Sequence, residues 1–343
     1  MMRLPLSWLL AFTTAALALL LLSSLATGPM TLTLGESLRA LFAGQESGIE
    51  SHKLLIVQEI RLPRTLLCIA VGGILGLCGA VMQGLFRNPL ADPGIIGVSG
   101  GAALGAALAI VLLAPLGQQL QATIGIGLLP LLAFLGGALT TTLVYLLGTR
   151  EGGTSVTVML LAGVAITALS GAVIGLLTYL ADDQMLRNLS LWQMGTLAAG
   201  KPADVALALL TLAALLWLFM RDANPLNALL LGEGEARHLG VNVQSLKRRL
   251  ILLTAAGVGV AVAVSGMIGF VGLVVPHLVR LLAGPNHVRL LPLSALLGAA
   301  LLLAADMLAR TLLAPAELPV GIITALLGAP FFIWLLVKGR RAL

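Results

Sequence analysis

The sequence predicts an all-α polytopic membrane protein of about ten transmembrane helices, organised as a single domain over residues 1–343. Hydrophobic residues make up 59% of the chain and charged residues only 10%, whereas about a quarter of a typical soluble domain is charged. Long charge-free runs recur, and most can supply the roughly 20 residues that a spanning helix needs. The runs cover residues 4–35, 65–86, 93–149, 152–181, 205–220, 250–279, 290–305 and 318–337.

The first apolar run follows a short basic start and allows two interpretations. Residues 24–26, Ser-Leu-Ala, resemble a signal-peptidase site, so the run could be a cleaved signal peptide. Signal cores are usually about 7–15 residues long, and residues 4–26 exceed that length. A retained first helix is therefore the favoured prediction.

The second helix is predicted to open at the Arg-Leu-Pro-Arg sequence of residues 61–64. It is followed by a polar turn with two prolines, residues 87–94, and then by another apolar run. Unsatisfied backbone groups cost several kcal/mol in hydrocarbon, so this turn must lie at the membrane surface or line a cavity walled by protein. Such a feature is typical of a transporter and not of a membrane anchor.

Two later stretches are too long for one span each. Proline, glycine and glutamine residues at 115–119 split residues 93–149 into two helices joined by a short loop. Residues 250–282 contain breaks at glycines 266 and 269 and at Pro276, which predicts two helices. With ten spans and a cytoplasmic N-terminus, most of the 20 Lys and Arg residues fall on the inner side, and both termini are cytoplasmic. This topology explains the basic pI of about 10 without a nucleic-acid partner.

Small residues indicate how the helices pack. Cys68 and Cys78 lie ten residues apart on one predicted helix, too far apart to bond, and are expected to be small buried hydrophobes. Many of the 40 glycines recur at four-residue spacing, as at 72/76, 97/101/105 and 171/175. Such spacing favours close helix packing, while dimerisation or the wall of a pathway remains the alternative at each position.

The sequence predicts no catalytic site. Residues 195–201 match the first seven positions of a phosphate-binding loop, but Pro202 stands where a Ser or Thr should hold Mg²⁺. No strand precedes the loop, and the predicted topology places it outside, away from ATP. No metal-binding motif occurs, and the four histidines are scattered. The chain is therefore expected to be neither an enzyme nor a metal protein.

A set of motifs distributed over the chain resembles one known family. The motifs occupy residues 61–64, 79–94, 97–101, 160–163, 269–277, 317–321 and 327–331. Together they resemble the FecCD-type permease subunits of bacterial ABC importers for ferric siderophores, haem and vitamin B12, over residues 5–338. The resemblance implies the type II ABC importer permease fold in the bacterial inner membrane. It also implies a second copy of the chain, two cytosolic ATPase subunits that hold the ATP, and a periplasmic binding protein.

Residues 83–87, 162–183 and 189–195 look more like the haem-importing branch of that family. The resemblance therefore implies an ATP-driven haem importer with no permanently bound cofactor and with haem as the transported substrate. A ferric-siderophore or vitamin B12 importer is the alternative within the family. An ion-coupled secondary transporter is the alternative from another class, and it should show ionisable residues near mid-membrane. Asp306 is the one candidate, but Arg310 four residues later can neutralise it.

The resemblance assigns a docking role to Arg61, Arg64 and Arg310 at the outer mouth. Exposed arginines can attract an acidic binding protein and form bidentate bonds to its carboxylates. The alternative is that they extend to the membrane interface for their own solvation.

Three further residues match positions near the inner constriction of the family's pathway, namely Asn88, Leu90 and Thr157. Small polar and aliphatic groups can close a pore without holding the cargo tightly. The alternative for Asn88 is that it caps the turn before Pro89.

Residues 226–245 form the largest polar segment predicted inside and resemble the short helices through which these permeases contact the ATPase. A glycine is well placed to end such a helix. The alternative is an inert solvated loop. The residues assigned to ATPase coupling are Glu233, Glu235, Arg237, His238, Leu239 and Gly240.

Overall fold

The computed structural model describes residues 5–42, 50–124, 127–150, 153–198 and 200–340, and these are almost entirely helical. Within these described residues, seven helices are long and apolar enough to cross a membrane, and three shorter apolar helices complete the ten that the sequence predicts. The long ones are α1 (Leu6–Ala26), the continuous helix Ser51–Leu85, α7 (Leu128–Gly148), α8 (Val156–Leu180), α10 (Pro202–Arg221), α13 (Val243–Ser265) and α15 (His287–Thr311). The shorter ones are α5 (Val98–Val111), α14 (Val271–Ala283) and the stretch Val320–Leu335 of α16 (Val320–Arg340).

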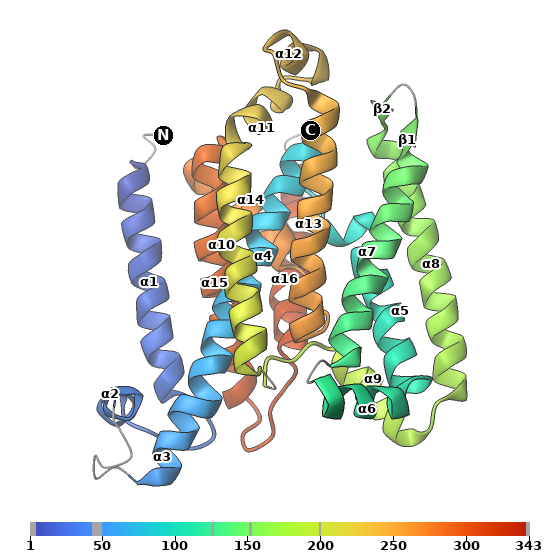
Figure 1. Ribbon diagram of the computed structural model, residues 1–343. Coiled ribbons are helices and arrows are strands. Elements are labelled where there is room, and N and C mark those ends of the chain that lie inside the picture. The colour runs from blue at the N-terminus through green and yellow to red at the C-terminus, as the bar shows by residue number, and fades with distance from the viewer. Residues whose placement is uncertain (1–4, 43–49, 125–126, 151–152, 199, 341–343) are drawn as a thin grey trace.

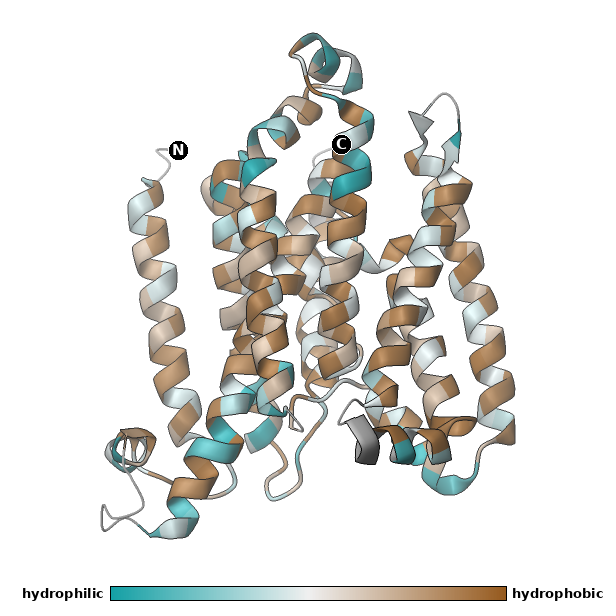
Figure 2. Ribbon diagram, viewed as in Figure 1, coloured by the Kyte–Doolittle hydropathy of each residue, from teal (hydrophilic) through white to brown (hydrophobic). Residues whose placement is uncertain are grey.

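Short elements decorate the two ends of this bundle (Figure 1). One end, called the α12 end below, carries α11 (Ala223–Leu230), α12 (Glu233–His238) and a small hairpin of β1 (Thr149–Arg150) and β2 (Gly153–Thr154). The opposite end, called the α2 end, carries α2 (Leu34–Phe42), α6 (Ala114–Ile124) and α9 (Asp183–Gln193). Apolar residues dominate the middle of the bundle and polar ones gather at both ends, as a membrane-spanning protein requires (Figure 2).

The core is built around α4 (Leu62–Leu85), which is buried along nearly its whole length. It packs most extensively on α15, where Gly72 and Gly76 lie directly against the backbone of Gly298 and Ser294. Because glycine has no Cβ, the two helices approach closely and gain van der Waals contact. The packing interpretation is confirmed here, whereas a Cβ at position 171 or 175 of α8 would meet no atom of another element within 4 Å.

The second spanning helix begins earlier than the sequence predicts. It starts with α3 (Ser51–Leu55) and passes through a π-helical segment, η1 (Ile56–Arg61), into α4, so Pro63 lies within a continuous helix. A proline removes one backbone donor and clashes with the carbonyl one turn earlier. A π-helical turn relieves that conflict without ending the helix.

Two other boundaries test the sequence-based predictions. The expected short loop near residue 115 is wrong, because α6 forms there and lies across the α2 end. The predicted division of residues 250–282 is confirmed, with a break from Gly266 to Phe270. Pro276 does not contribute to that break, since it lies inside α14.

The polar turn after α4 lines a cavity within the protein. Asp92 caps the short helix η2 (Pro93–Ile96) by accepting a hydrogen bond from the amide of Gly94 at 2.7 Å. This segment, with Val258 of α13 and Gly272 of α14, borders a cavity of about 180 Å³. The chain therefore turns back into the bundle before α5 begins, which explains why α5 is short. Both locations that the sequence allowed are therefore occupied: residues 87–89 are exposed at the α12 end, and residues 92–94 line the protein-walled cavity.

Candidate functional site

Five ionisable residues form a cluster at the α2 end. This cluster joins α1, α4 and α15. Its centre is Asp306, whose carboxylate lies 2.9 Å from Nη2 of Arg64 and 3.0 Å from Nε of Arg310. Arg64 also donates through Nη1 to Glu317 at 2.6 Å. We call these residues, with Arg61, the arginine cluster.

The last carbonyl groups of α1 explain why further arginines gather here. The final four carbonyls of a helix have no partner within it. Arg61 donates to the carbonyls of Leu25 and Ala26 at 2.7 and 2.8 Å, and Arg310 donates to Thr27 at 3.0 Å. The two guanidinium groups therefore fix the end of α1 to the neighbouring helices.

The expectation that these arginines are exposed at the outer mouth is wrong. Arg61, Arg64 and Arg310 are only 3%, 6% and 2% exposed, and Asp306 is fully buried. Buried charges need a paired and hydrogen-bonded environment, and the cluster provides one within the protein itself. Asp306 is paired as the sequence suggested, with a second arginine, Arg64, that sequence spacing could not reveal.

The three residues assigned to the inner constriction come from two elements that touch. Asn88 is exposed, and its side chain accepts a hydrogen bond from the amide of Leu90 at 2.9 Å, so it caps the turn as the alternative interpretation proposed. Thr157 is exposed in the first turn of α8. The two segments meet where Gly163 of α8 packs on the backbone of Ile95. The structure thus places Asn88, Leu90 and Thr157 near the α12 end.

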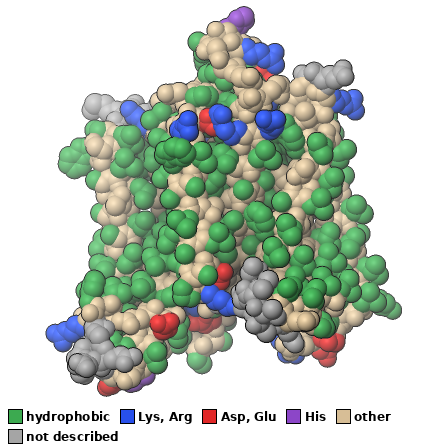
Figure 3. Space-filling view, in the orientation of Figure 1, with side chains coloured by type: hydrophobic (Ala, Val, Ile, Leu, Met, Phe, Trp, Pro, Cys, Tyr) green, Lys and Arg blue, Asp and Glu red, His purple; other side chains and the backbone are tan. Residues whose placement is uncertain are grey.

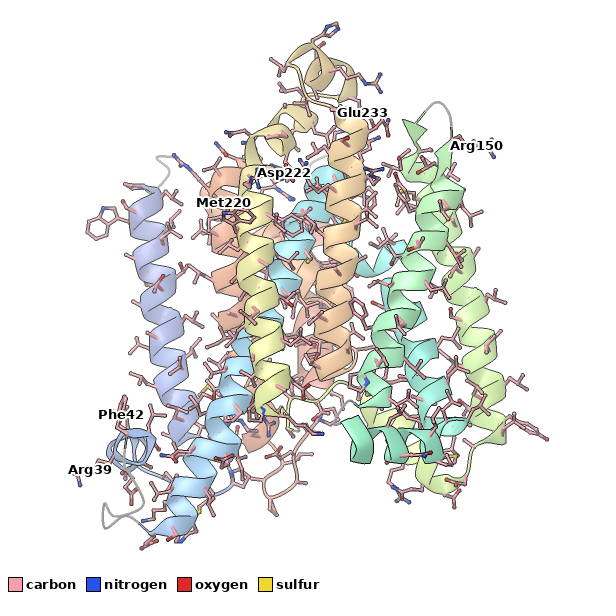
Figure 4. The ribbon with its side chains drawn as sticks, in the orientation of Figure 1. Arg39, Phe42, Arg150, Met220, Asp222 and Glu233 are labelled. Atoms are coloured by element: carbon pink, nitrogen blue, oxygen red, sulfur yellow. The ribbon has the colours of Figure 1, made fainter. Side chains whose placement is uncertain are left out.

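The segment of residues 226–245 projects from the α12 end as two short helices and not one (Figures 1 and 4). Gly240 adopts a positive φ of 83°, and its amide bonds to the carbonyl of Arg237 at 2.9 Å, so it ends α12 as predicted. Leu239 is 64% exposed. Glu235, Arg237 and His238 are exposed beside it.

Glu233 differs from its neighbours because its carboxylate is directed back to the bundle. It lies 2.5 Å from Nζ of Lys247, a residue of α13 that is only 2% exposed. The same ammonium group donates to the carbonyl of Thr154 in the β hairpin at 3.0 Å. Lys247 therefore joins α12, α13 and the hairpin. Its ion pair with Glu233 attaches the start of α12 to α13.

Lys247 is not identified as a buried residue in the sequence analysis, although its spacing from apolar neighbours indicates burial. Its position, four residues after Val243 and three before Leu250, places it on the buried face of α13. The run of three basic residues, 247–249, instead suggested a solvated surface. Arg248 and Arg249 are indeed exposed, and Arg249 binds the buried carboxylate of Asp222 through Nε at 2.7 Å.

A second missed set attaches α11 to the start of α15. Oδ1 of Asn227 accepts from the backbone amide of His287 at 2.8 Å and lies 2.9 Å from its Nδ1. Asn227 also donates to Asn286 at 3.0 Å. The buried imidazole packs on Gly84 near the end of α4. Residues 226–245 are thereby fixed to both α4 and α15.

Comparisons with known proteins agree with this architecture. A profile of the FecCD transport family matches residues 16–338. The chain is 47% identical over 336 residues to the hemin transport system permease protein HmuU of Yersinia pestis, covering 97% of this chain and 96% of that one. It is 42% identical over 334 residues to the vitamin B12 import system permease protein BtuC of Shigella boydii, with the same coverage of both chains. These relatives are named as permeases and not as enzymes.

Solved structures show the same fold. A metal-chelate type ABC transporter in an inward-facing conformation superposes with a TM-score of 0.82 at 34% identity, covering 97% of this chain and all of that one. PsaBC of Streptococcus pneumoniae superposes with a TM-score of 0.55 at 20% identity, over 79% of this chain and 89% of that one, which concerns the fold alone. The fold is that of type II ABC importer permeases, and the chain belongs to the FecCD transport family.

Proposed function

We propose that this chain is the permease subunit of an ATP-driven haem importer in a bacterial inner membrane. The observation that carries the proposal is the 47% identity to a hemin permease over nearly the whole of both chains. Haem is then the transported substrate, no cofactor is bound permanently, and ATP is hydrolysed on a separate subunit.

In this proposal the α12 end faces the cytoplasm, together with both termini. The basic row at this end of the apolar surface supports that orientation, because Lys and Arg are enriched on cytoplasmic faces (Figure 3). Two ATPase subunits would dock on α12 through the exposed groups of Glu235, Arg237, His238 and Leu239. Leu239 supplies the apolar contact that helix-in-groove recognition needs.

A second copy of the chain would complete the pathway. Helix α8 supports this part of the proposal, because large apolar side chains on it are exposed along its length, Leu161 and Leu169 among them. Gly171 and Gly175 are open on the same helix, and small residues allow close approach of a partner helix. Asn88, Leu90 and Thr157 would narrow the inner mouth of the pathway between the two copies.

The burial of the arginine cluster changes how we propose that it serves the binding protein. Arg61 and Arg310 stabilise the end of α1, and Arg64 positions Glu317, whose side chain is 34% exposed. The cluster would therefore shape the docking surface, and not present free guanidinium groups. Under this proposal Arg310→Met weakens docking and lowers stability together. Weaker docking at full stability would instead indicate a direct contact.

The ion-coupled alternative loses its candidate residue. Asp306 lies between two guanidinium groups, and an ion-coupling carboxylate must be free to bind and release its ion. Vitamin B12 remains an alternative cargo within the family. Permeases named for the import of vitamin B12 or cobalamin are 40–44% identical to this chain.

Uptake into proteoliposomes tests the proposal. The chain is reconstituted with its ATPase and binding protein, and haem, a ferric siderophore and cobalamin are supplied in parallel with ATP. We expect ATP-dependent uptake of haem in preference to the other two. Preference for another cargo would overturn the haem assignment, and uptake driven by an ion gradient without the ATPase would overturn the class.

A further inference from the structure

A basic pocket opens at the α12 end, and its lining includes none of the residues assigned to docking, to the inner constriction or to ATPase coupling. It encloses about 290 Å³ and is lined by Gln83, Arg87, Pro89, Leu230, Arg280 and His287 among others. These residues come from the end of α4, the turn after it, α11, and the corner between α14 and α15. We call it the basic pocket.

The two guanidinium groups of this pocket lack an acidic partner. Among the residues that the structure describes, no carboxylate lies within 4 Å of Arg87 or Arg280. Arg280 donates to Oε1 of Gln83 at 2.9 Å, and the amide group of Gln83 is oriented by donating to the carbonyls of Gly272 and Leu273. One hydrogen bond to a neutral amide leaves the other donors of Arg280 available.

Uncompensated arginines in a concave site predict an anionic ligand with several acceptor oxygens. Arg280 is partly buried, so its interaction with an anion is screened less than on an open surface. Arg87 is exposed at the rim and can adapt to the ligand. The two together offer a formal charge of +2 to the occupant.

The location identifies the kind of anion. Two candidate membrane spans, Ser51–Leu85 and α15, and the shorter apolar helix α14 begin or end at the pocket, which sets it at the level of the lipid headgroups. Directly after Arg280, Leu281 and Leu282 are 66% and 61% exposed and offer an apolar surface for acyl chains. Basic pockets between membrane helices on the cytoplasmic side are known to accept anionic lipid headgroups.

We propose that the basic pocket binds the phosphate of an anionic phospholipid from the leaflet at the α12 end. No acidic group lines the pocket to accept the ammonium of a zwitterionic headgroup. One phosphate neutralises only half of the +2 charge, so cardiolipin, with two phosphates, binds more tightly than phosphatidylglycerol. The lipid then contacts both α11 and the turn that carries Asn88. This inference rests on the proposed function in one respect only, namely that the leaflet at the α12 end is called cytoplasmic.

Lipid binding to the purified full-length chain tests this inference, by native mass spectrometry after delipidation. Cardiolipin, phosphatidylglycerol, phosphatidylcholine and inorganic phosphate are added in separate titrations. We expect affinity to fall in that order. Arg87→Gln should weaken cardiolipin binding about fivefold, and the double variant with Arg280→Gln about 25-fold, because each basic group near a lipid surface contributes comparably.

Arg248→Gln is the matched control, because Arg248 is exposed at the same end and lies outside the pocket. It should bind cardiolipin as the unaltered chain does. Because Arg87 is exposed, the single variant keeps its fold, so its result stands even if the double variant unfolds. Equal cardiolipin binding by Arg87→Gln and the unaltered chain would overturn the proposal.

Two other results would also overturn it. Inorganic phosphate that displaces cardiolipin at equal concentration would identify a site for a free anion. Unchanged lipid binding together with weaker ATPase assembly in Arg87→Gln would identify a protein carboxylate as the occupant. A failure of haem uptake would not affect these measurements, so the two proposals can fail independently.

Discussion

Replacing Asp306 by asparagine should be among the most destabilising single changes in this protein. The carboxylate is fully buried and shared by Arg64 and Arg310, whose side chains are 7% and 3% exposed. Asparagine has nearly the same shape but carries no charge. The substitution therefore leaves two buried guanidinium groups, of which only Arg64 retains an acidic partner, Glu317.

The expected size follows from the behaviour of buried ion pairs. Removing one partner of such a pair typically costs about 3–5 kcal/mol, because an uncompensated charge stays buried. Two arginines depend on Asp306, but Glu317 and the carbonyls of α1 continue to solvate them. We therefore expect a loss of about 3–5 kcal/mol in the free energy of unfolding, and not twice that amount.

Equilibrium unfolding in mixed micelles, followed by tryptophan fluorescence, measures this loss. Glu59→Gln is the control, because Glu59 is an exposed carboxylate near the same end of the bundle and should change stability by less than about 0.5 kcal/mol. A triple change of Asp306, Arg64 and Arg310 to apolar residues should recover much of the loss, since no charge then remains unpaired. If Asp306→Asn and Glu59→Gln unfold alike, the cluster does not stabilise the fold.

Two further predictions concern the purified chain, and a third concerns the reconstituted complex. Gly79→Ala should cost about 1–3 kcal/mol in unfolding free energy, because its Cβ would overlap the backbone of α14, while Gly171→Ala should be neutral; equal effects would contradict the packing account. The pKa of Glu36 is lowered to about 2, first by the backbone amide of Thr33 and then by Lys53, so its stabilising contribution is full above about pH 4.5 and is lost as the pH falls towards 2. Hydrogen exchange of α2 should show this loss, and Glu36→Gln should remove the pH dependence; a variant with the same pH profile would refute it. Lys247→Met should lower ATP-driven uptake per ATP hydrolysed in the reconstituted complex, and an unchanged ratio would show that α12 needs no support from α13.

The sequence predicts those features that are local along the chain. Ten apolar helices follow from hydropathy, and the end of α12 follows from Gly240 in a left-handed conformation. The cap formed by Asn88 is also a local feature, since its partner amide lies two residues away. Each depends on a periodicity or a contact within a few residues.

The sequence fails where the partner is distant. Arg64 and Asp306 are 242 residues apart, so nothing near Arg64 indicates that its charge is already neutralised. An arginine at the end of an apolar run therefore looks exposed, even when it fixes another helix. The start of the second spanning helix is predicted too late for a different reason. Proline normally starts a helix, but here a π-helical turn lets the helix continue through Pro63.

The two central helices connect the parts of the molecule to which different partners are assigned. Gly72 and Gly76, about one turn apart on α4, lie against the backbone of Gly298 and Ser294 and hold α4 and α15 together at close range. At the α2 end the pair is fixed by Asp306, and at the α12 end α15 is fixed to α11 by the bonds of His287 to Asn227. Packed helices shift as rigid bodies more readily than they deform. A displacement of α11 must therefore either break the Asn227 contacts or move α15, and with it the arginine cluster at the far end.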